Sequence, residues 1–131
     1  MAIVHVSGTR KRAKARATLR AGTGVIRVNK LRLDQYQPEL YRQRILEPLM
    51  IAGDVSKKVN IDVTVEGGGI NGQADAARCA ISRALVQYDK DLEAPFLAYD
   101  RQLLVPDVRR KEPAKPGRHG QARAKRQKSY R

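Results

Sequence analysis

The sequence predicts a small α+β domain followed by an extended basic tail. Several short segments alternate apolar and polar residues, as half-buried strands do. Two longer segments repeat apolar residues every three or four positions, as helices do. Apolar residues then almost vanish after residue 105. We therefore expect residues 1–105 to form one globular domain that includes a basic N-terminal strand region, and residues 106–131 to form the tail.

Four segments have the pattern of strands, and they are residues 3–6, 17–21, 25–33 and 59–65. The three residues from Gly22 to Gly24 read as a short hairpin connection between the second and third segments. Segment 25–33 alternates regularly, so one of its faces can be buried.

Residues 34–51 have the apolar spacing of a helix that covers the core. Pro38 lies near a first turn, and Pro48 is expected to divide the segment into two short helices because proline lacks the amide hydrogen that a helix interior needs. Gly53 and Asp54 end this segment. A further short helix is expected within residues 92–105, closed by Pro106.

Residues 67–88 are the stretch around which the rest of the chain is expected to be organised. Three glycines follow the strand at 59–65, and the apolar period then changes from two to between three and four. A row of small residues, Ala76, Ala80 and Ala84, would let the resulting helix lie close on a sheet. Asn71 is the expected N-cap, and the helix is expected to end near residues 89–91.

The glycine turn of this stretch is open to several interpretations. Gly67, Gly69 and Gly72 have the spacing of a dinucleotide-binding fingerprint, but residues 89–95 do not look like the second strand which that fold requires. A P-loop is excluded because no Lys-Ser or Lys-Thr pair follows the glycines. A tight turn that needs glycine for its backbone, or a turn whose amides meet nucleic-acid phosphates, explains the motif better.

The net charge of +14 is carried by the two ends of the chain. Residues 1–33 hold nine Lys or Arg and no acid, and residues 109–131 hold ten with one acid, whereas residues 34–108 hold eight bases and twelve acids. Charge packed this densely repels itself unless a polyanion is present, so nucleic acid is the expected partner. The tail has too few apolar residues to offset its ordering entropy and is expected to be disordered until it binds.

The densest basic cluster of the domain comprises Arg10, Lys11, Arg12, Lys14 and Arg16. Basic residues alternate with alanine from position 12 to 16, which predicts an extended segment that shows its charges on one side. Lys and Arg also protect exposed sheet edges from aggregation, and this alternative stays open for Arg27 and Arg32.

Enzyme chemistry finds little support, and no catalytic residue, metal site or cofactor is expected. His5 and His119 have no acid or nucleophile beside them, and one cysteine, Cys79, can form neither an internal disulfide nor a usual zinc site. A lone cysteine favours a reducing, cytoplasmic setting. No leader segment precedes residue 6, and no apolar run approaches the roughly 20 residues of a membrane span. We therefore expect a soluble protein with no membrane partner.

Several motifs together resemble one family. The run Gly67-Gly-Gly-x-x-Gly-Gln73, followed by Ala76, Ala80 and Arg83-Ala-Leu85, resembles the signature of the small-subunit ribosomal protein number nine family. The resemblance extends to Gly8-Thr-Arg-Lys-Arg with Ala15-Arg16, to Asp34-Gln-Tyr36, to Leu85-x-x-Tyr-Asp89 and to the basic tail. The ending Lys125-Arg-Gln-Lys-Ser-Tyr-Arg131 is similar to the archaeal and eukaryotic branch, and the lack of a long N-terminal extension favours an archaeal source.

The resemblance implies a fold like the second domain of small-subunit ribosomal protein number five. That fold is a four-stranded sheet with helices on one face and a left-handed β-α-β crossover. Periodicity cannot give this handedness, since the general rule for such connections predicts a right-handed one.

The resemblance also implies a structural constituent of the small ribosomal subunit. Such a protein binds the 3′-domain ribosomal RNA of the subunit head among neighbouring ribosomal proteins, and its tail reaches the anticodon stem-loop of transfer RNA in the peptidyl site. The expected ribosomal RNA contacts are Arg10, Lys11, Arg12, Lys14, Arg16, Gly68, Gly69, Gln73, Arg109, Arg110, Lys115, Arg118, Arg123, Lys125 and Arg126. The expected transfer RNA contacts are Lys128, Ser129, Tyr130 and Arg131.

Two other classes of function stay open on the residues alone. A free nucleic-acid binder, such as a chromatin-like protein or an RNA chaperone, would satisfy the charge pattern but would wash off small subunits at moderate salt. A nucleotide-cofactor enzyme would bind a dinucleotide at millimolar concentration.

Overall fold

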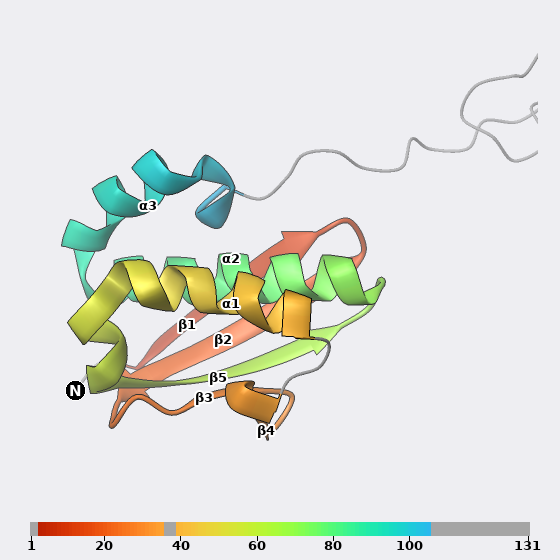
Figure 1. Cartoon of the computed structure of the whole chain (residues 1–131), viewed down its shortest axis with the longest axis horizontal. Coiled ribbons are helices and arrows are strands. Elements are labelled where there is room, and N and C mark those ends of the chain that lie inside the picture. The colour runs from red at the N-terminus through yellow and green to blue at the C-terminus, as the bar shows by residue number, and fades with distance from the viewer. Residues whose placement is uncertain (1–2, 36–38, 106–131) are drawn as a thin grey trace, which may run out of the picture.

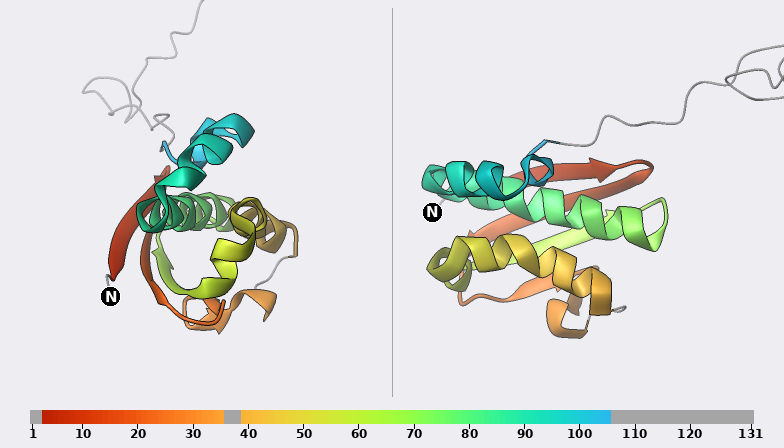
Figure 2. Two further views of the ribbon diagram at one scale, coloured as in Figure 1. Left: turned by 90° about the vertical axis from the view of Figure 1, so that its left-hand side faces the viewer. Right: turned by 45° about the horizontal axis from the view of Figure 1, so that its top comes forward.

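One five-stranded sheet carries the helices on one of its faces, as the computed structural model shows (Figure 1; Figure 2, left). The structure describes residues 3–35 and 39–105. The strands are β1 (Val4–Arg10), β2 (Ala13–Ala21), β3 (Ile26–Val28), β4 (Leu31–Arg32) and β5 (Val59–Glu66). The helices are α1 (Glu39–Ala52), α2 (Ile70–Tyr88) and α3 (Glu93–Tyr99), joined by the 3₁₀ turns η1 (Leu33–Gln35), η2 (Gly53–Lys58), η3 (Lys90–Leu92) and η4 (Arg101–Leu103).

The strand order is β1-β2-β5-β3-β4. Neighbouring strands are antiparallel except for β3 and β5, which run parallel and are connected through α1. The α+β prediction is confirmed, but the predicted number of four strands is one too few. The left-handedness of the crossover stays a prediction.

The additional strand arises because the predicted strand at 25–33 is a small hairpin. Asn29 and Lys30, at its turn, have φ angles of 52° and 68°, which a two-residue turn requires and which Asn tolerates better than most residues. The Asn29 side chain fixes this turn by accepting a hydrogen bond of 2.8 Å from the Val65 amide. The predicted strand at 25–33 was therefore correct for β3 and wrong from Asn29 onward, where the chain turns and returns as β4.

Strands β1 and β2 are both longer than predicted, because most of the basic segment between the two predicted strands also belongs to the antiparallel pair. Arg10 lies opposite Ala13, and Gly8 opposite Ala15. In β2, residues 13, 15, 17 and 19 are buried, whereas 14, 16 and 20 are exposed. The prediction of an extended segment with its charges on one side is confirmed.

The prediction for Pro48 was wrong, because α1 continues through it to Ala52. Pro48 is fully buried and lies one turn before the helix ends. The helix loses one hydrogen bond there because proline has no amide hydrogen, and the burial of the proline ring offsets this loss. Ile45 and Leu49 confirm that this helix covers the core. Pro38 lies outside the described residues.

Helix α2 is the centre of the helical layer, since it packs on β1 and β2 and against α1. Its predicted end is confirmed, because Tyr88 is its last residue. Its predicted start was wrong: the N-cap is Gly69, and Asn71 lies in the first turn, where its side-chain oxygen accepts a hydrogen bond from Arg44.

The row of small residues on α2 has the role expected of it. A Cβ atom placed on Gly8 of β1 would lie 2.6 Å from both the Ala76 carbonyl oxygen and the Ala80 amide nitrogen. Helix and strand backbones therefore touch at this point, which only glycine in the strand and alanine on the helix allow.

The segment after α2 closes the core. Leu92, Phe96 and Leu103 are buried, so the short helix predicted within 92–105 is α3 with 3₁₀ turns on either side. Arg78 of α2 links this segment to α1, because its guanidinium donates to Asp100 Oδ2 at 3.3 Å and to Glu47 Oε2 at 2.6 Å.

Candidate nucleic-acid interface

The face of the sheet opposite the helices is basic. We name it the open face and define it by the outward side chains of β1 to β5 (Figure 2, left). Its charged members are five bases and two acids, namely Lys14, Arg16, Arg20, Arg27, Arg32, Asp62 and Glu66. Short polar side chains such as Thr18 and Thr64 lie between them, so the surface presents hydrogen-bond donors as well as positive charge.

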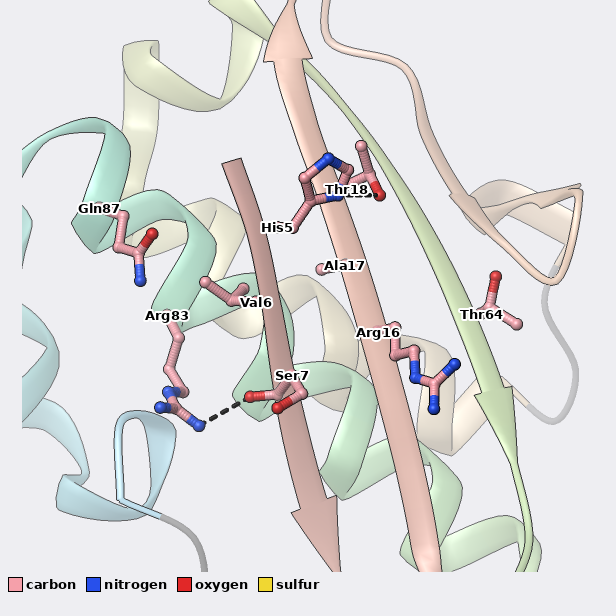
Figure 3. A pocket seen from close by; sticks show the side chains of 9 residues that line it. All are labelled: His5, Val6, Ser7, Arg16, Ala17, Thr18, Thr64, Arg83 and Gln87. Carbon is pink, nitrogen blue, oxygen red and sulfur yellow. Dashed lines mark hydrogen bonds between the residues drawn. The ribbon is translucent and has the colours of Figure 1, made fainter. Parts of the chain in front are cut away.

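Arg16 occupies the middle of this face. It lies opposite Ser7 on β1 and Thr64 on β5, and within the described residues it has no ion-pair partner. A hollow of about 660 Å³ beside β1 is lined by Arg16, Ser7, Thr18, Thr64, His5 and Arg83, among others (Figure 3). A guanidinium and several hydroxyls that line one hollow suit a phosphate group.

Two other side chains of the hollow, those of His5 and Arg83, form hydrogen bonds within the protein. His5 Nδ1 forms a hydrogen bond of 3.1 Å with Thr18 Oγ1, and Arg83 of α2 donates to the Ser7 carbonyl oxygen at 2.7 Å (Figure 3). Ser7 belongs to β1, an edge strand, so Arg83 covers part of that edge.

The structure separates Arg10 from the rest of the predicted basic cluster. Strand alternation turns Arg10 toward the helices, where its Nε lies 3.6 Å from Asp75 Oδ2. Arg44 of α1 approaches the other oxygen of Asp75 at the same distance. Arg10 thus ties the hairpin to α2, and Arg44 ties α1 to the same carboxylate, whereas the side chains of Lys14 and Arg16 face away from the helices.

The glycine turn packs directly against the basic hairpin. Gly67 and Gly68 have φ angles of +79° and +64°. A Cβ atom on Gly67 would lie 2.7 Å from the Arg12 carbonyl oxygen, and one on Gly68 would lie 3.0 Å from the Ala13 amide nitrogen. These glycines are therefore required by the turn and by its contact with the hairpin, which supports the interpretation as a tight turn.

Gln73 supports the same turn from inside the helix. Its side-chain amide donates a hydrogen bond of 3.1 Å to the Gly67 carbonyl oxygen. The predicted contact of Gln73 with ribosomal RNA stays a prediction, and the structure gives this side chain a positioning contact within the turn.

Gly69 differs from Gly67 and Gly68 because neither its backbone conformation nor its packing requires a glycine. Its φ is −96°, and a Cβ atom there would meet nothing within 4 Å. As the N-cap of α2 it provides no side chain to the first-turn amides, and no acid occupies that turn. The positive end of a 19-residue helix thus lies beside the basic hairpin, where an anion would be stabilised.

Sequence reasoning missed Arg20 and treated Arg27 and Arg32 as possible edge protection. The missing signal was the continuation of the alternation from Arg16 through Thr18 to Arg20 on the same face. The predicted contacts between residues 109 and 131 lie outside the described residues.

No group of three or more His, Cys, Asp and Glu residues in the part of the chain that the structure describes is placed to hold a metal ion. Burial raises the pKa of the Cys79 thiol, against the opposing attraction of Arg83. Within residues 3–35 and 39–105, no helix combines the length and apolar character needed to cross a bilayer.

Comparison with known proteins gives matches along almost the entire chain. The profile of a family described as "Ribosomal protein S9/S16" matches residues 8–131. The "Small ribosomal subunit protein uS9" of Picrophilus torridus is 54% identical over 126 residues, which cover 95% of this chain and 94% of the relative. The protein of the same name from Methanococcus maripaludis is 46% identical over 134 residues, which cover all of both chains. Both organisms are archaea, in agreement with the branch that the C-terminal ending indicates.

Proposed function

This chain belongs to the ribosomal protein S9/S16 family, and from this we propose that it binds ribosomal RNA in the small ribosomal subunit. Its role is structural: it is a ribosomal RNA-binding protein of that subunit and contributes to translation. We further propose that it lies in the cytoplasm, in the subunit head, on the 3′-domain RNA, and that it catalyses no reaction. The observation that carries this proposal is the open face, a basic surface that the helices leave uncovered on a protein with these relatives.

On the open face, Lys14 and Arg16 are the central phosphate contacts, and Arg20 and Arg27 extend the surface along the sheet. Contacts of this kind hold a protein in register on folded RNA without reading its sequence. The hydroxyls of Thr18 and Thr64 are of the right chemistry for ribose 2′-hydroxyls and phosphate oxygens.

The second contact is the junction between the hairpin and the glycine turn. Lys11 and Arg12 lie at the hairpin turn, directly beside the N-terminus of α2. The backbone of this hairpin turn lies against the glycine turn, so a phosphate at the N-terminus of α2 would be close to both the helix amides and two basic residues. Arg10 and Gln73 act through this geometry, since they hold the hairpin and the turn in place.

The third contact is the tail. We propose that its basic residues neutralise ribosomal RNA phosphates along their path and that Lys128, Ser129, Tyr130 and Arg131 reach transfer RNA in the peptidyl site. Residues 106–131, if fully extended, would span at most roughly 90 Å, which is the greatest distance at which the end of the tail could meet an RNA site. Arginine offers a planar fork to phosphate oxygens, and tyrosine can stack on a base.

The test is a paired removal of charge. We expect the double variant Lys14→Ala/Arg16→Ala to bind a 3′-domain ribosomal RNA fragment more weakly, because two phosphate contacts are lost. The slope of log affinity against log salt should become shallower by about 1.4 to 1.8, at about 0.7 to 0.9 for each neutralised phosphate. Filter binding of the full chain over a range of potassium concentrations measures this slope.

The matched control removes one lysine and one arginine on the helical side, as Lys90→Ala/Arg101→Ala. Both side chains are exposed, and neither belongs to the open face. This variant should keep the parental salt slope. If both double variants changed the slope equally, or neither did, the open face would not be the RNA-binding surface.

A further inference from the structure

Helix α3 presents an apolar surface to solvent. Phe96 is its only buried residue, and all the others are exposed. Leu97 is 43% exposed and Tyr99 is 58% exposed; helical spacing puts them on the two flanks of the exposed side of α3, with Ala94 and Ala98 between them. We name this surface the α3 face and include in it the two acids that border it, Asp91 and Glu93.

The charge of the α3 face is opposite to that of the molecule. Residues 89–100 contain four acids and one base, in a chain with a net charge of +14. Asp91 and Glu93 are exposed and have no ion-pair partner within the described residues. Two unpaired carboxylates repel phosphate groups, so this surface is unsuited to RNA.

The position of the α3 face keeps it away from the proposed RNA contacts. It follows the C-terminus of α2, whereas the basic hairpin lies at the N-terminus of the same helix (Figure 1; Figure 2, right). The 19 residues of α2 correspond to about 28 Å of helix. The chain could therefore bind RNA through the hairpin and the open face while the α3 face meets something else.

We propose that the α3 face docks a basic segment of a neighbouring protein in the small ribosomal subunit. Lysine and arginine side chains suit it because an aliphatic stem can lie on Leu97 while the charged end meets Glu93, which lies one turn away on the same side of the helix, with Asp91 preceding it in the chain. Arginine can also stack on the exposed Tyr99 ring. A second copy of this chain offering the same face would bring acids against acids. This inference rests on the proposed function, which supplies the assembly in which such a neighbour is found.

Photochemical cross-linking in intact small subunits tests this docking. The full chain carries p-benzoylphenylalanine in place of Leu97, or of Tyr99 in a second variant, and the subunits that have incorporated it are purified and irradiated. We expect cross-links to a peptide of another ribosomal protein, with lysine or arginine next to the attachment point. Charge reversal by Asp91→Lys/Glu93→Lys should lower the yield about tenfold, because two favourable pairs become repulsive.

The control places the same photoreactive residue at Met50, which is 77% exposed on α1. Its cross-linking yield should not respond to the charge reversal. Cross-links from position 97 or 99 to ribosomal RNA, to residues 106–131 of the same chain, or to nothing would overturn the proposal, and so would a yield that ignores the reversal. Absence of the unmodified chain from purified small subunits would instead contradict the proposed function.

Discussion

The side chain that Gly8 lacks is what lets β1 approach α2. A methyl group there would lie 2.6 Å from backbone atoms of Ala76 and Ala80, and backbone cannot move aside as a flexible side chain can. We expect Gly8→Ala to lower the free energy of unfolding by about 1–3 kcal/mol, the usual cost of overpacking. Urea denaturation followed by circular dichroism measures this.

A matched substitution in the same strand is Ser7→Ala. Ser7 is exposed, and only its backbone oxygen is used, by Arg83. Its substitution should change the free energy of unfolding by less than about 0.5 kcal/mol. Equal effects of the two substitutions would show that helix and strand do not touch at Gly8.

Cys79 gives a residue-level prediction in alkaline solution. Burial raises the pKa of its thiol above the ordinary value of 9.0, so above that pH the unfolded chain loses this proton while the folded chain keeps it. The contribution to stability is therefore complete below pH 9 and is lost as the pH rises toward the folded pKa, by at most about 1.4 kcal/mol per pH unit.

The comparison that isolates this effect is between the parent chain and Cys79→Ala, each unfolded in urea at pH 7 and at pH 10. The two proteins differ only in the thiol, so only the parent should lose the additional stability. A stability difference between the two that is the same at both pH values would contradict a buried thiol with a raised pKa.

Arg10 and Arg16 show what local sequence can predict about a site. Alternation correctly placed Arg16 on the side away from the buried alanines, because strand period is a local property. The partner of Arg10 could not be predicted, because Asp75 is 65 positions away and reaches Arg10 only when α2 packs on the hairpin.

At the scale of elements, the N-terminus of α2 allows stability and binding to be separated. Gly69 has the extended backbone of an N-cap, and there is space for a side chain. We expect Gly69→Asp to raise the free energy of unfolding by about 0.5 kcal/mol, because its carboxylate accepts from first-turn amides and meets the positive helix end. The same variant should bind ribosomal RNA more weakly, since the carboxylate occupies the proposed phosphate position.

Gly69→Ser is the control for charge, because serine caps the helix without adding a negative charge. The serine variant should have a free energy of unfolding close to that of the aspartate variant. Its RNA affinity should fall less than that of the aspartate variant. Thermal unfolding and filter binding, made on the same protein preparations, give both quantities. If Gly69→Asp bound RNA as tightly as the parent, the amides of this turn would not face phosphate.

Elements themselves were predicted best where periodicity is long and worst at turns. Helix α2 was identified with its C-terminus one residue from the predicted range of 89–91, because its small and apolar residues recur at helical spacing over the whole segment. The Asn29-Lys30 turn was missed because no glycine marks it; Asn29 adopts a positive φ that contacts with β5 stabilise. The predicted break at Pro48 followed from the low intrinsic helix propensity of proline. In the structure the burial of Pro48 in the core outweighs that propensity.

At the scale of the molecule, alternation marks which face of the sheet is buried but not which elements bury it. Every second residue of β2 and β5 is apolar and buried, whereas the packing of α2 on these strands and of α1 against α2 joins segments far apart in the chain. The charge distribution did predict a polyanionic partner, because net charge along the chain is independent of how the chain folds.

The tail gives the prediction that involves the whole molecule. If half of its ten basic residues engage single-stranded RNA, they should contribute a slope of about −3.5 in log affinity against log salt, at about 0.7 for each phosphate. A chain that ends at Val105 should lose this part of the slope. Its melting temperature should stay that of the full chain, since the described core lies entirely before residue 106.

Removal of the last four residues tests the proposed reach to transfer RNA. Small subunits carrying a chain without Lys128, Ser129, Tyr130 and Arg131 should assemble normally but release peptidyl-site transfer RNA faster, because the terminal cations and the tyrosine no longer meet its anticodon stem-loop. Arg109→Ala/Lys111→Ala removes the same number of charges near the start of the tail and should leave this release unchanged. Dissociation rates of labelled transfer RNA from the two sets of purified subunits provide the comparison. Equal rates would mean that the tail contributes only general positive charge, and that its final residues have no separate role at the peptidyl site.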